Sequence, residues 1–530
     1  MRYGKGHGII KPMNSLGKSS CSSRKPVSAP EGDPAPLTAE IALLRETLRV
    51  KDIKIQALTL EIARLRRVQF SAKSEVLSAE QRDLFDDAMM QDLCATEAEL
   101  DTLASTQPAT PRARSGRQPL PEHLERIEVR HEPESCTCAT CQSELVKIGE
   151  DVSEQLDVEP ARFRVLRHIR PQYACRKCEI VTAAPVPPAV IDGGLATTNL
   201  LTWVAIGKYL DHLPLYRLEQ IALRQQVNLS RSTLSEWIGR MGVALQPLAD
   251  RLVELLKQGH ILHADETPVQ QLDPGAGKTR RAYLWSYRTN VFDTGPPIVV
   301  FDYQTSRSGK HAAEFLQDWR GTLMVDDYGG YKALFGHGVT ELGCWAHARR
   351  KFFDLHAAGG HPVAEQTLAR IARLYAIEAD TQDMDCAARA QHRVQHSEPE
   401  LTALYDWLTQ LRPTVANGGA LAKAIDYSLK RWPALIRYAA SGDLPIDNNP
   451  VENAIRPIAL GKKNWLFAGS ERAGRRAAAI QSLFATAKLN GIEPAAWLKD
   501  TLDKLPIWPN SRIDELLPFR PQAQTACSTN

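Results

Sequence analysis

The sequence predicts a multidomain protein in which helical regions flank a cysteine-rich module and an α/β core. Three observations predict this class: a length of 530 residues, an N-terminal seam of apolar residues at heptad spacing, and two Cys-x2-Cys pairs. At roughly 100–200 residues per domain, this length indicates about three or four domains. Hydrophobic residues make up 43% and charged residues 24%, a composition typical of globular proteins rather than natively disordered chains.

Charge and hydropathy exclude some classes of function and leave others open. Lysine and arginine total 65 against 62 acidic residues, so the net charge of +3 gives no global sign of nucleic-acid binding. Nucleic-acid binding must therefore be inferred from local basic patches. No run of about 18 uncharged apolar residues occurs, so we expect no membrane span. The N-terminus, MRYGKGHGIIKPMNS, lacks the apolar segment of a secretory signal.

The N-terminal third contains a leader, a helical region and a linker. Residues 1–36 lack periodicity and predict a disordered leader, whereas 37–104 predict helices. The seam there predicts either a dimerising coiled coil or a hairpin with a helix at about 78–104. Prolines in 105–121 predict a linker before the next module. The positions of the seam are Ile41, Leu44, Leu48, Lys51, Ile55, Leu58, Ile62 and Leu65.

The segment 122–185 contains two Cys-x2-Cys pairs. Their four thiolates can surround one structural Zn²⁺ tetrahedrally, giving a zinc-ribbon-like module. Cys136 is an alternative to the first ligand, and coincidental free cysteines are the simpler interpretation. Two strands are expected between the pairs, at 152–158 and 162–170. The expected zinc ligands are Cys138, Cys141, Cys175 and Cys178.

The second of these strands is expected to have one basic face and one apolar face. Arg162 and Arg164 alternate with Phe163 and Val165, and successive side chains of a strand point to opposite faces. The arginines then contact DNA phosphates or compensate the negative charge of the zinc thiolates. The sequence leaves both interpretations open.

Residues 195–256 predict an all-helical domain that contains a helix-turn-helix candidate. A helix at 216–226 is followed by a turn at 227–229 and by a second helix that ends near Met241. Ser230 or Thr233 is expected to cap the second helix. Arg231 would then lie at the end that enters a DNA groove, although an ordinary helical hairpin has the same pattern.

Three carboxylates are placed at predicted element ends in the α/β region. The segment 260–268 predicts a strand that ends at Asp265 and is closed by Pro268, and 321–330 predicts a strand that ends at Asp326. Glu452 falls in the first turn of a helix that Asn448 or Asn449 caps. Carboxylates held in this way suit two Mg²⁺ ions, which catalyse phosphoryl transfer.

A basic cluster follows the third carboxylate and predicts a phosphate clamp, with Trp465 available for base stacking. A solvated cationic face around a core tryptophan is the alternative. Two further features have simpler explanations. Cys344 and His347 suggest a second metal site, but a strand-to-helix junction with a basic helix face explains them better. His263 is expected to be packed. The basic cluster that follows Glu452 contains Arg456, Lys462, Lys463, Arg472, Arg475 and Arg476.

Several motifs together resemble the transposases of the insertion sequence 66 family. The resemblance spans nearly all of residues 40–500 in the order of the family, and the longest motif, at 447–470, is the most specific. Residues 148–179 resemble the zinc-binding segment of the same proteins. The other motifs are HADETPV (263–269), VDDYGGY (325–331), CWAHARRKF (344–352) and TAKLNGIEP (486–494).

This resemblance implies a DDE transposase with a ribonuclease-H-like core at 257–500 and a helical insertion at about 355–440. Its acidic triad maps onto Asp265, Asp326 and Glu452, with Mg²⁺ or Mn²⁺ as the catalytic ion. The enzyme would bind the element ends in double-stranded DNA, expose a 3′-OH and join it to target DNA. We also expect a homo-oligomer, small accessory proteins of the same element, and a bacterial cytoplasmic, nucleoid-associated location. Residues 506–530 are expected to form a tail.

Three positions depart from the family pattern. Asp327 occupies a glycine position, Gln142 replaces the glycine after Cys141, and Asn453 stands where an arginine usually follows the third acid. The alternative to a transposase is therefore a catalytically decayed, zinc-containing repressor that binds the same DNA. Metal-dependent DNA cleavage distinguishes the two.

Overall fold

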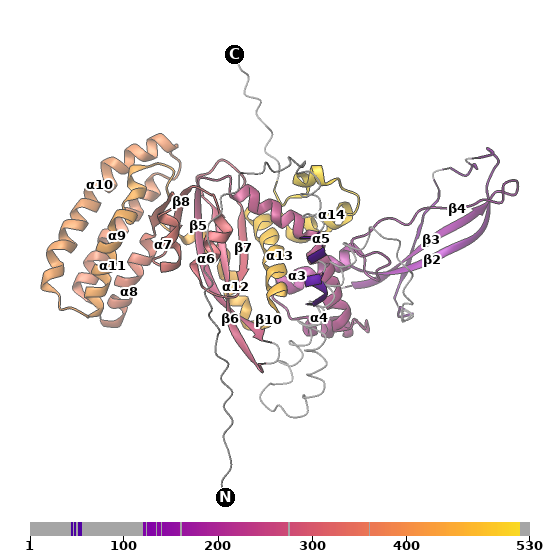
Figure 1. Ribbon diagram of the computed structural model, residues 1–530, viewed down its shortest axis with the longest axis horizontal. Helices are drawn as coiled ribbons and strands as arrows, with labels where there is room; N and C mark the ends of the chain where they lie inside the picture. The colour runs from indigo at the N-terminus through magenta and orange to yellow at the C-terminus, as the bar shows by residue number, and fades with distance from the viewer. Residues whose placement is uncertain are drawn as a thin grey trace, which may run out of the picture. The chain divides into compact units, whose positions relative to one another are not determined.

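The computed structural model (Figure 1) describes most of the chain from residue 120 to residue 519 and short pieces before it. By contacts, the chain divides into residues 1–51 and 52–530. The predicted leader, the linker and most of the seam with its possible hairpin partner lie outside the described residues. Of the seam positions, Leu44, Leu48, Lys51 and Ile55 are helical and exposed. The described ranges are 44–45, 47–48, 51–55, 120–122, 124–133, 135–138, 140–159, 162–273, 276–359 and 361–519.

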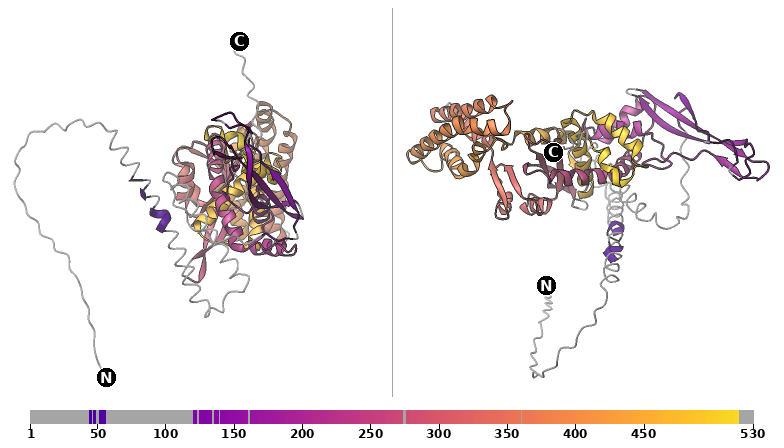
Figure 2. Two further views of the ribbon diagram at one scale, coloured as in Figure 1. Left: turned by 90° about the vertical axis from the view of Figure 1, so that its right-hand side faces the viewer. Right: turned by 90° about the horizontal axis from the view of Figure 1, so that it is seen from above.

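The cysteine-rich module is built on a long antiparallel hairpin, seen as a ribbon in Figures 1 and 2. Strand β2 (Val146–Glu159) pairs with β3 (Arg162–Ala174), so both predicted strands are present and longer than expected. Strand β1 (Arg126–Arg130) pairs with β3 in parallel, and β4 (Val181–Ala183) pairs with it in antiparallel fashion.

The helical region contains α3 (Thr198–Tyr209), α4 (Leu215–Leu223) and α5 (Arg231–Leu256). Ser230 caps α5, because its Oγ accepts from the amide of Thr233 at 3.2 Å. The expected end at Met241 was wrong, since the helix continues for fifteen more residues. Helix α5 packs against α3, α4, α13 and β7, and this contact buries apolar side chains over more than one face.

The α/β core contains a mixed sheet in the order β7-β6-β5-β8-β9. Strands β5, β6 and β7 are antiparallel, whereas β8 and β9 run parallel to β5. Strand β10 (Phe467–Ala468) pairs with the end of β5. The bounds are β5 Ile261–Asp273, β6 Lys278–Thr289, β7 Val299–Gln304, β8 Gly321–Val325 and β9 Val339–Gly343; α6 (Gly309–Leu316), η2 (Gly329–Tyr331) and α7 (Lys332–Phe335) lie between them in sequence.

The two faces of this sheet belong to different hydrophobic cores. On one face, Leu262, Trp285 and Leu323 join the core that includes α3, α4 and α5. On the other face, residues such as Leu284 pack against Ile458 of α12 (Asn449–Trp465). Helix α13 (Glu471–Leu489) runs along the edge strand β7, where hydroxyl groups of the helix bond to the strand backbone. Helices therefore cover both faces of the sheet.

A group of helices follows β9 and precedes α12, as the resemblance implied (Figures 1 and 2). It has its own apolar core, with Trp345, Phe352 and Leu404 fully buried. The helices begin at Trp345, ten residues before the expected 355, because α8 starts directly after β9. The elements are α8 (Trp345–Gly359), α9 (Pro362–Asp380), α10 (Cys386–Leu411), η3 (Arg412–Thr414), α11 (Ala420–Leu435) and η4 (Arg437–Ala440).

The C-terminal part adds α14 (Pro494–Lys504) and a short 3-10 helix, η5 (Asn510–Leu516). The indole of Trp497 donates to the carbonyl of Leu516 at 3.0 Å, and Asp514 pairs with Arg251 of α5 at 2.7 Å. The expected tail therefore contains an ordered segment that packs on the core. Among the described helices, none is long and apolar enough to cross a membrane.

Candidate functional site

The first two predicted acids lie on neighbouring parallel strands. The pairing of β5 with β8 ends at His263 and Met324, and continuing its register by two residues places Asp265 opposite Asp326. Neighbouring strands lie about 4.7–4.9 Å apart. Two carboxylates 61 positions apart in sequence are therefore side by side at the end of β8.

Asp265 was expected at the end of a strand, and this was wrong. Strand β5 continues through Pro268 to Asp273, so Asp265 lies in its middle, opposite Ser286 of β6. Pro268 is tolerated because the β8 pairing has already ended at His263, which leaves that edge of β5 without a neighbour at Pro268. The strand that ends next to Asp265 is β8, not β5, so the edge of β5 that faces β8 has no paired strand at Asp265.

Asp326 directly follows β8, as predicted, and its Oδ1 accepts from the amide of Tyr328 at 2.8 Å. Its neighbour Asp327 instead pairs with Arg431 of α11 at 3.5 Å. Arg431 is buried, also contacts Glu341, and donates to the carbonyl of Asp326 at 3.2 Å. The residue in the glycine position of the family thus helps to anchor the helical insertion, while Asp326 faces the other acids.

Glu452 reaches the same place from the first turn of α12. Asn448 is the N-cap residue, yet its side chain does not cap the helix. Its amide donates to the carbonyl of Ala264 at 2.8 Å and its Oδ1 accepts from Nδ1 of the fully buried His263 at 3.0 Å. This buried pair of hydrogen bonds fixes the start of α12 to the strand that carries Asp265. His263 is therefore a packed histidine, as expected, and its hydrogen bond to Asn448 helps to position α12.

The pKa of Asp265 depends on burial and on the neighbouring acids. Burial is the largest of the causes that raise this pKa to about 7, followed by the adjacent Glu266 carboxylate and then by the charges of Glu452 and Asp326. Like charges held together in a partly buried site destabilise each other unless a cation separates them. The donor set consists of hard carboxylate oxygens, which are the ligands that Mg²⁺ and Mn²⁺ prefer. The residues present therefore fit such an ion.

The four predicted zinc ligands also come together. The sulfur atoms of Cys138, Cys141, Cys175 and Cys178 all lie within 4.8 Å of one another, and two of them are 3.4 Å apart. Cys136 is exposed and is not part of the group, so the alternative first ligand is excluded. Four thiolates without an open position suit a structural Zn²⁺.

The two cysteine knuckles have the same backbone geometry. In the first, Cys138 N donates to Ser143 O at 2.8 Å and Gln142 N donates to Cys138 O at 2.9 Å; in the second, Cys175 makes the equivalent bonds at 3.0 and 2.8 Å. Gln142 and Glu179 occupy equivalent positions with φ of 60° and 56°. This left-handed conformation favours glycine. It explains the glycine of the family pattern where this chain has Gln142.

The arginines of the hairpin are paired within the hairpin or next to it. Across the β2–β3 register, Arg164 lies opposite Asp157 and Arg170 opposite Asp151, with ion-pair distances of 3.0 and 2.8 Å. Arg162 pairs with Glu125, and Phe163 and Val165 are buried on the other face, as predicted. Cross-strand pairs of opposite charge stabilise a hairpin. Arg162 and Arg164 are thus paired with carboxylates rather than with the zinc thiolates, and their contact with DNA phosphates stays a prediction.

The remaining DNA-binding candidates fall into three groups. Arg231 lies at the start of α5, 3.2 Å from Glu219, but the helix behind it is largely buried, which does not fit a recognition helix. Arg476 is only 6% exposed and packs against Gly242, so it is not a surface cation. The others lie on the outside of α12 and α13. Arg456, Lys463 and Arg475 are exposed, and Lys462 donates to the carbonyl of Pro268 at 2.8 Å.

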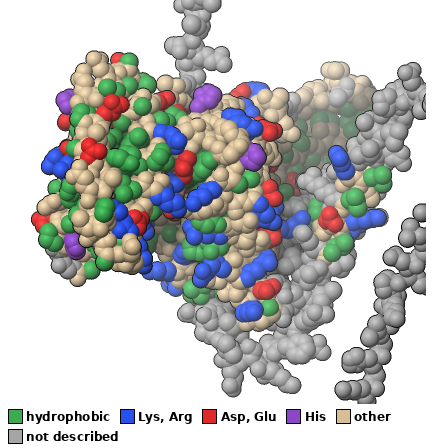
Figure 3. Space-filling model, turned by 60° about the vertical axis from the view of Figure 1, so that its left-hand side comes forward, with side chains coloured by type: hydrophobic (Ala, Val, Ile, Leu, Met, Phe, Trp, Pro, Cys, Tyr) green, Lys and Arg blue, Asp and Glu red, His purple; other side chains and the backbone are tan. Residues whose placement is uncertain are grey.

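Sequence reasoning missed a cavity beside Glu452. Its volume is about 610 Å³, and its lining includes Arg349, Arg350, Phe353, Tyr375 and Asn449. The guanidinium of Arg350 lies 3.7 Å from the Glu452 carboxylate. The signal in the sequence was the spacing of the basic and aromatic residues of α8, which predicted only a basic helix face. Lys and Arg side chains gather in the middle of the face shown in Figure 3.

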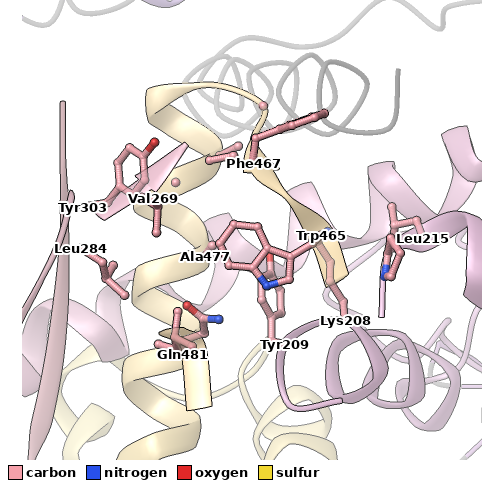
Figure 4. A pocket seen from close by; sticks show the side chains of 16 residues that line it. Lys208, Tyr209, Leu215, Val269, Leu284, Tyr303, Trp465, Phe467, Ala477 and Gln481 are labelled. Carbon is pink, nitrogen blue, oxygen red and sulfur yellow. The ribbon is translucent and has the colours of Figure 1, made fainter. Parts of the chain in front are cut away.

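A second pocket lies on the α12 face of the sheet and is apolar (Figure 4). Trp465 lies at its centre, with Phe467 above it, Tyr209 below it and Leu284 to its left. Its cavity volume is only about 80 Å³, and none of the three acids lines it. Trp465 is therefore held among apolar side chains, which favours the core tryptophan over a base-stacking residue.

Comparisons with known proteins agree with this architecture. The family model described as "Transposase IS66 family" matches residues 193–476, and "zinc-finger binding domain of transposase IS66" matches 135–179. "IS66 C-terminal element" matches 482–519, and "Transposase C of IS166 homeodomain" matches 57–129. The chain is 39% identical over 516 residues to the uncharacterized protein y4qI of Sinorhizobium fredii (strain NBRC 101917 / NGR234), covering 94% of this chain and 95% of that protein. Identity to y4jD of the same strain is 37% over 462 residues, with 84% and 90% covered.

Proposed function

Because the chain belongs to the IS66 family of transposases and has the zinc-finger domain of that family, we propose that it cuts DNA at the ends of an insertion sequence and joins the cut ends to target DNA. The observation that carries this proposal is that Asp265 lies close enough to Glu452 and Asp326 for their charges to raise its pKa, behind burial and the Glu266 carboxylate as the larger causes. Three acids from β5, β8 and α12 form a two-metal phosphoryl-transfer site.

We further propose that the core is ribonuclease-H-like. Three antiparallel strands followed by two parallel strands support this, with the first two acids on the adjacent strands β5 and β8. The third acid comes from a helix after the insertion, packed on the same sheet face as Asp265. We keep the boundaries 257–500 for this core and assign the helices after β9 to its insertion.

The acids have distinct roles in the proposal. Asp265 on β5 and Asp326 directly after β8 would hold the ions, and Glu452 would complete the site from α12. When bound, Mg²⁺ or Mn²⁺ would supply charge stabilisation of the attacking and leaving oxygens. The backbone amide of Tyr328 orients Asp326, and Asn448 orients α12 relative to β5. These contacts hold the carboxylates in place before DNA binds.

DNA is expected to lie across the cations next to Glu452. Arg349 and Arg350 line the cavity beside this acid, and Arg456 and Lys463 are exposed on α12. Guanidinium and ammonium groups contact phosphates, while Phe353 and Tyr375 offer aromatic faces in the same cavity. Arg164 and Arg476 are left out of this surface, because one is paired with a buried aspartate and the other is buried.

The chemistry needs two successive nucleophiles and no covalent protein intermediate. Water attacks the phosphodiester at the element end, and the bond to the 3′ oxygen breaks to give a 3′-OH. That hydroxyl then attacks a phosphorus of target DNA in line, and the leaving group is the 3′ oxygen of the target strand. The zinc domain and the N-terminal helices would recognise ends and assemble a homo-oligomer, with small accessory proteins of the element as further partners.

The alternative of a decayed repressor rests on Asn453, which lacks the usual cation beside the third acid. Asn453 is exposed, and Arg350 of α8 lies 3.7 Å from the Glu452 carboxylate. A cation is therefore present at this acid, supplied from another helix. This observation favours the catalytic function.

Cleavage of labelled DNA that carries the element ends flanking this gene tests the proposal. In Mg²⁺ or Mn²⁺, the wild type is expected to leave a 3′-OH nick at the end, and Asp326→Asn is expected to leave none. Asp327→Asn is the matched control, since the neighbouring residue has the same chemistry but pairs with Arg431. Sequence-specific binding without cleavage, with and without the accessory proteins, would establish the repressor instead. Cleavage by Asp326→Asn at the wild-type level would remove Asp326 from the site.

A further inference from the structure

Cys344, His347 and Glu452 form a second group of metal-type side chains at the edge of the acidic site. Cys344 directly follows β9, His347 lies in the first turn of α8, and Glu452 lies in the first turn of α12. One sulfur, one ring nitrogen and one carboxylate oxygen all lie within 4.8 Å of one another. Three elements that are far apart in sequence thus bring a thiol, an imidazole and a carboxylate together.

Two atoms of this group lack the partners that buried polar atoms normally have. His347 Nδ1 and Glu452 Oε1 are 3.5 Å apart, and both are buried without a hydrogen bond among the described residues. An unpaired buried polar atom costs roughly 1–3 kcal/mol. A cation bound between them would give both atoms a ligand role.

The sulfur of Cys344 is already oriented as an acceptor. The amide of Asn448 donates to it at 3.2 Å, and Cys344 itself is fully buried between β9 and α12. The backbone amides of Asn448 and His347 both donate to this sulfur. A divalent cation that replaces the thiol proton would therefore meet a sulfur with its N–H···S bonds in place.

We propose that Cys344, His347 and Glu452 bind a borderline-soft divalent cation of the Zn²⁺ type. Thiolate and imidazole select such ions over Mg²⁺, and three protein ligands leave one position open for water. This site differs from the four-cysteine group because its ligands are a thiol, an imidazole and a carboxylate rather than four thiols. Glu452 belongs to both this site and the proposed magnesium site.

The shared carboxylate gives the site a consequence, which rests on the proposed function. An ion held by Cys344 and His347 takes Glu452 away from the catalytic pair. Zn²⁺ and Mg²⁺ then compete, and a rise in free Zn²⁺ lowers strand cleavage without any change in DNA binding. The second metal would act as an inhibitor rather than as a structural ion.

Cobalt binding to the full-length, zinc-loaded protein tests the site without reference to activity. Co²⁺ is titrated after the four-cysteine group has been filled with Zn²⁺, and thiolate-to-cobalt absorption is recorded. We expect one further Co²⁺ per chain in the wild type. Cys344→Ser and His347→Gln should weaken this binding by about 10-fold or more. Cys386→Ser, which removes an exposed cysteine elsewhere, should leave it unchanged.

Two outcomes would overturn the site: no further Co²⁺ in the wild type, or undiminished thiolate absorption in both variants. His347→Gln protects the test against misfolding, because His347 is 21% exposed whereas Cys344 is in the core. Far-ultraviolet circular dichroism of each variant confirms that it is folded.

Competition is tested separately, by the ratio of cleavage with and without added Zn²⁺ in each protein. The concentration of Zn²⁺ that halves cleavage should rise about 10-fold or more in His347→Gln. Equal inhibition of wild type and variant would refute the competition but not the site. Cobalt binding in a wild type that never cleaves DNA would refute the proposed function while the site stands.

Discussion

The two metal-type regions of this chain are built in opposite ways. In the zinc module, the four ligands are soft, come from two short knuckles of equal geometry, and surround a position that has no open side. In the core, the three proposed ligands are hard and come from β5, the end of β8 and α12, which are separated by long stretches of sequence. The first site needs its ion to hold the knuckles together. The second is held by the fold, which forces like charges together.

This difference explains what each region tolerates. Each knuckle is formed by consecutive residues, Cys138–Ser143 or Cys175–Ile180, so it can be recognised from the sequence and disrupted by one local substitution. The acidic site depends on distant positioning contacts, such as those of Asn448 to β5 and of Arg431 to the end of β8. Substitutions should therefore affect folding in the first region and geometry in the second.

The largest effect is expected from Cys175→Ser. Loss of one thiolate removes the ion, and structural zinc sites contribute about 10–16 kcal/mol of apparent binding free energy. Zinc content should fall by one ion per chain, and limited proteolysis should cut the module while the core fragment stays intact. Cys136→Ser is the control, because Cys136 is exposed and outside the group. If Cys175→Ser keeps the zinc of the module, the claim that this region depends on all four thiolates is wrong.

Asn448→Ala should impair geometry more than stability. The change leaves Nδ1 of His263 and the carbonyl of Ala264 without their bonds, at a cost of about 2–3 kcal/mol. Cleavage should fall about 10–100-fold while DNA affinity stays the same. Asn449→Ala is the matched control, since Asn449 bonds only to Asp447 among the residues described. Equal effects of both substitutions would show that Asn448 has no positioning role.

Asp265→Asn should stabilise the core while it abolishes cleavage. The folded pKa of about 7 lies above the unfolded value near 3.9, so stability is full below pH 4 and is lost as pH rises through 7. Without Mg²⁺, the gain at pH 8 should be about 1–2 kcal/mol and should be smaller at pH 5. Urea unfolding followed by tryptophan fluorescence measures it. A loss of stability at pH 8 would mean that the acids do not repel one another.

The smallest effect is expected from Gln142→Gly in the first knuckle. Glycine adopts the φ of 60° without strain, so the module should gain about 0.5–1 kcal/mol. The zinc concentration that protects the module from proteolysis should fall accordingly. Thr140→Gly serves as the control, because Thr140 lacks a positive φ and glycine there should destabilise. Stabilisation by both glycines would point to a general effect of flexibility.

How far the sequence alone could go differs between the two regions. The four-cysteine group, the β2 and β3 strands, the place of Asp326 after a strand and that of Glu452 in the first turn of a helix could be predicted because each depends on local spacing. Asp265 was misplaced at a strand end, because the end of the β8 pairing, a tertiary feature, decides where Pro268 is tolerated. The buried surfaces of α5 and Arg476 were missed for the same reason. Both depend on which helices pack against them.

The ion pairs of the hairpin were also beyond sequence reasoning. Arg164 stands opposite Asp157 only because the β2–β3 register fixes that pair, and a shift of one residue would have left it free. The cavity between α8 and α9 needed the insertion to be folded before Phe353 and Tyr375 could share it. Sequence patterns identify which residues carry chemistry, and packing decides which of them meet.

The most direct measurement of the central claim is anomalous scattering from crystals of the full chain, loaded with one equivalent of Zn²⁺ for the four-cysteine group, freed of excess Zn²⁺ and then soaked in Mn²⁺. Data above and below each absorption edge assign the two elements independently. The expected result is a zinc peak within the four sulfur atoms of Cys138, Cys141, Cys175 and Cys178, and manganese between Asp265, Asp326 and Glu452. Manganese elsewhere, with the three carboxylates bare, would contradict the proposed catalytic site.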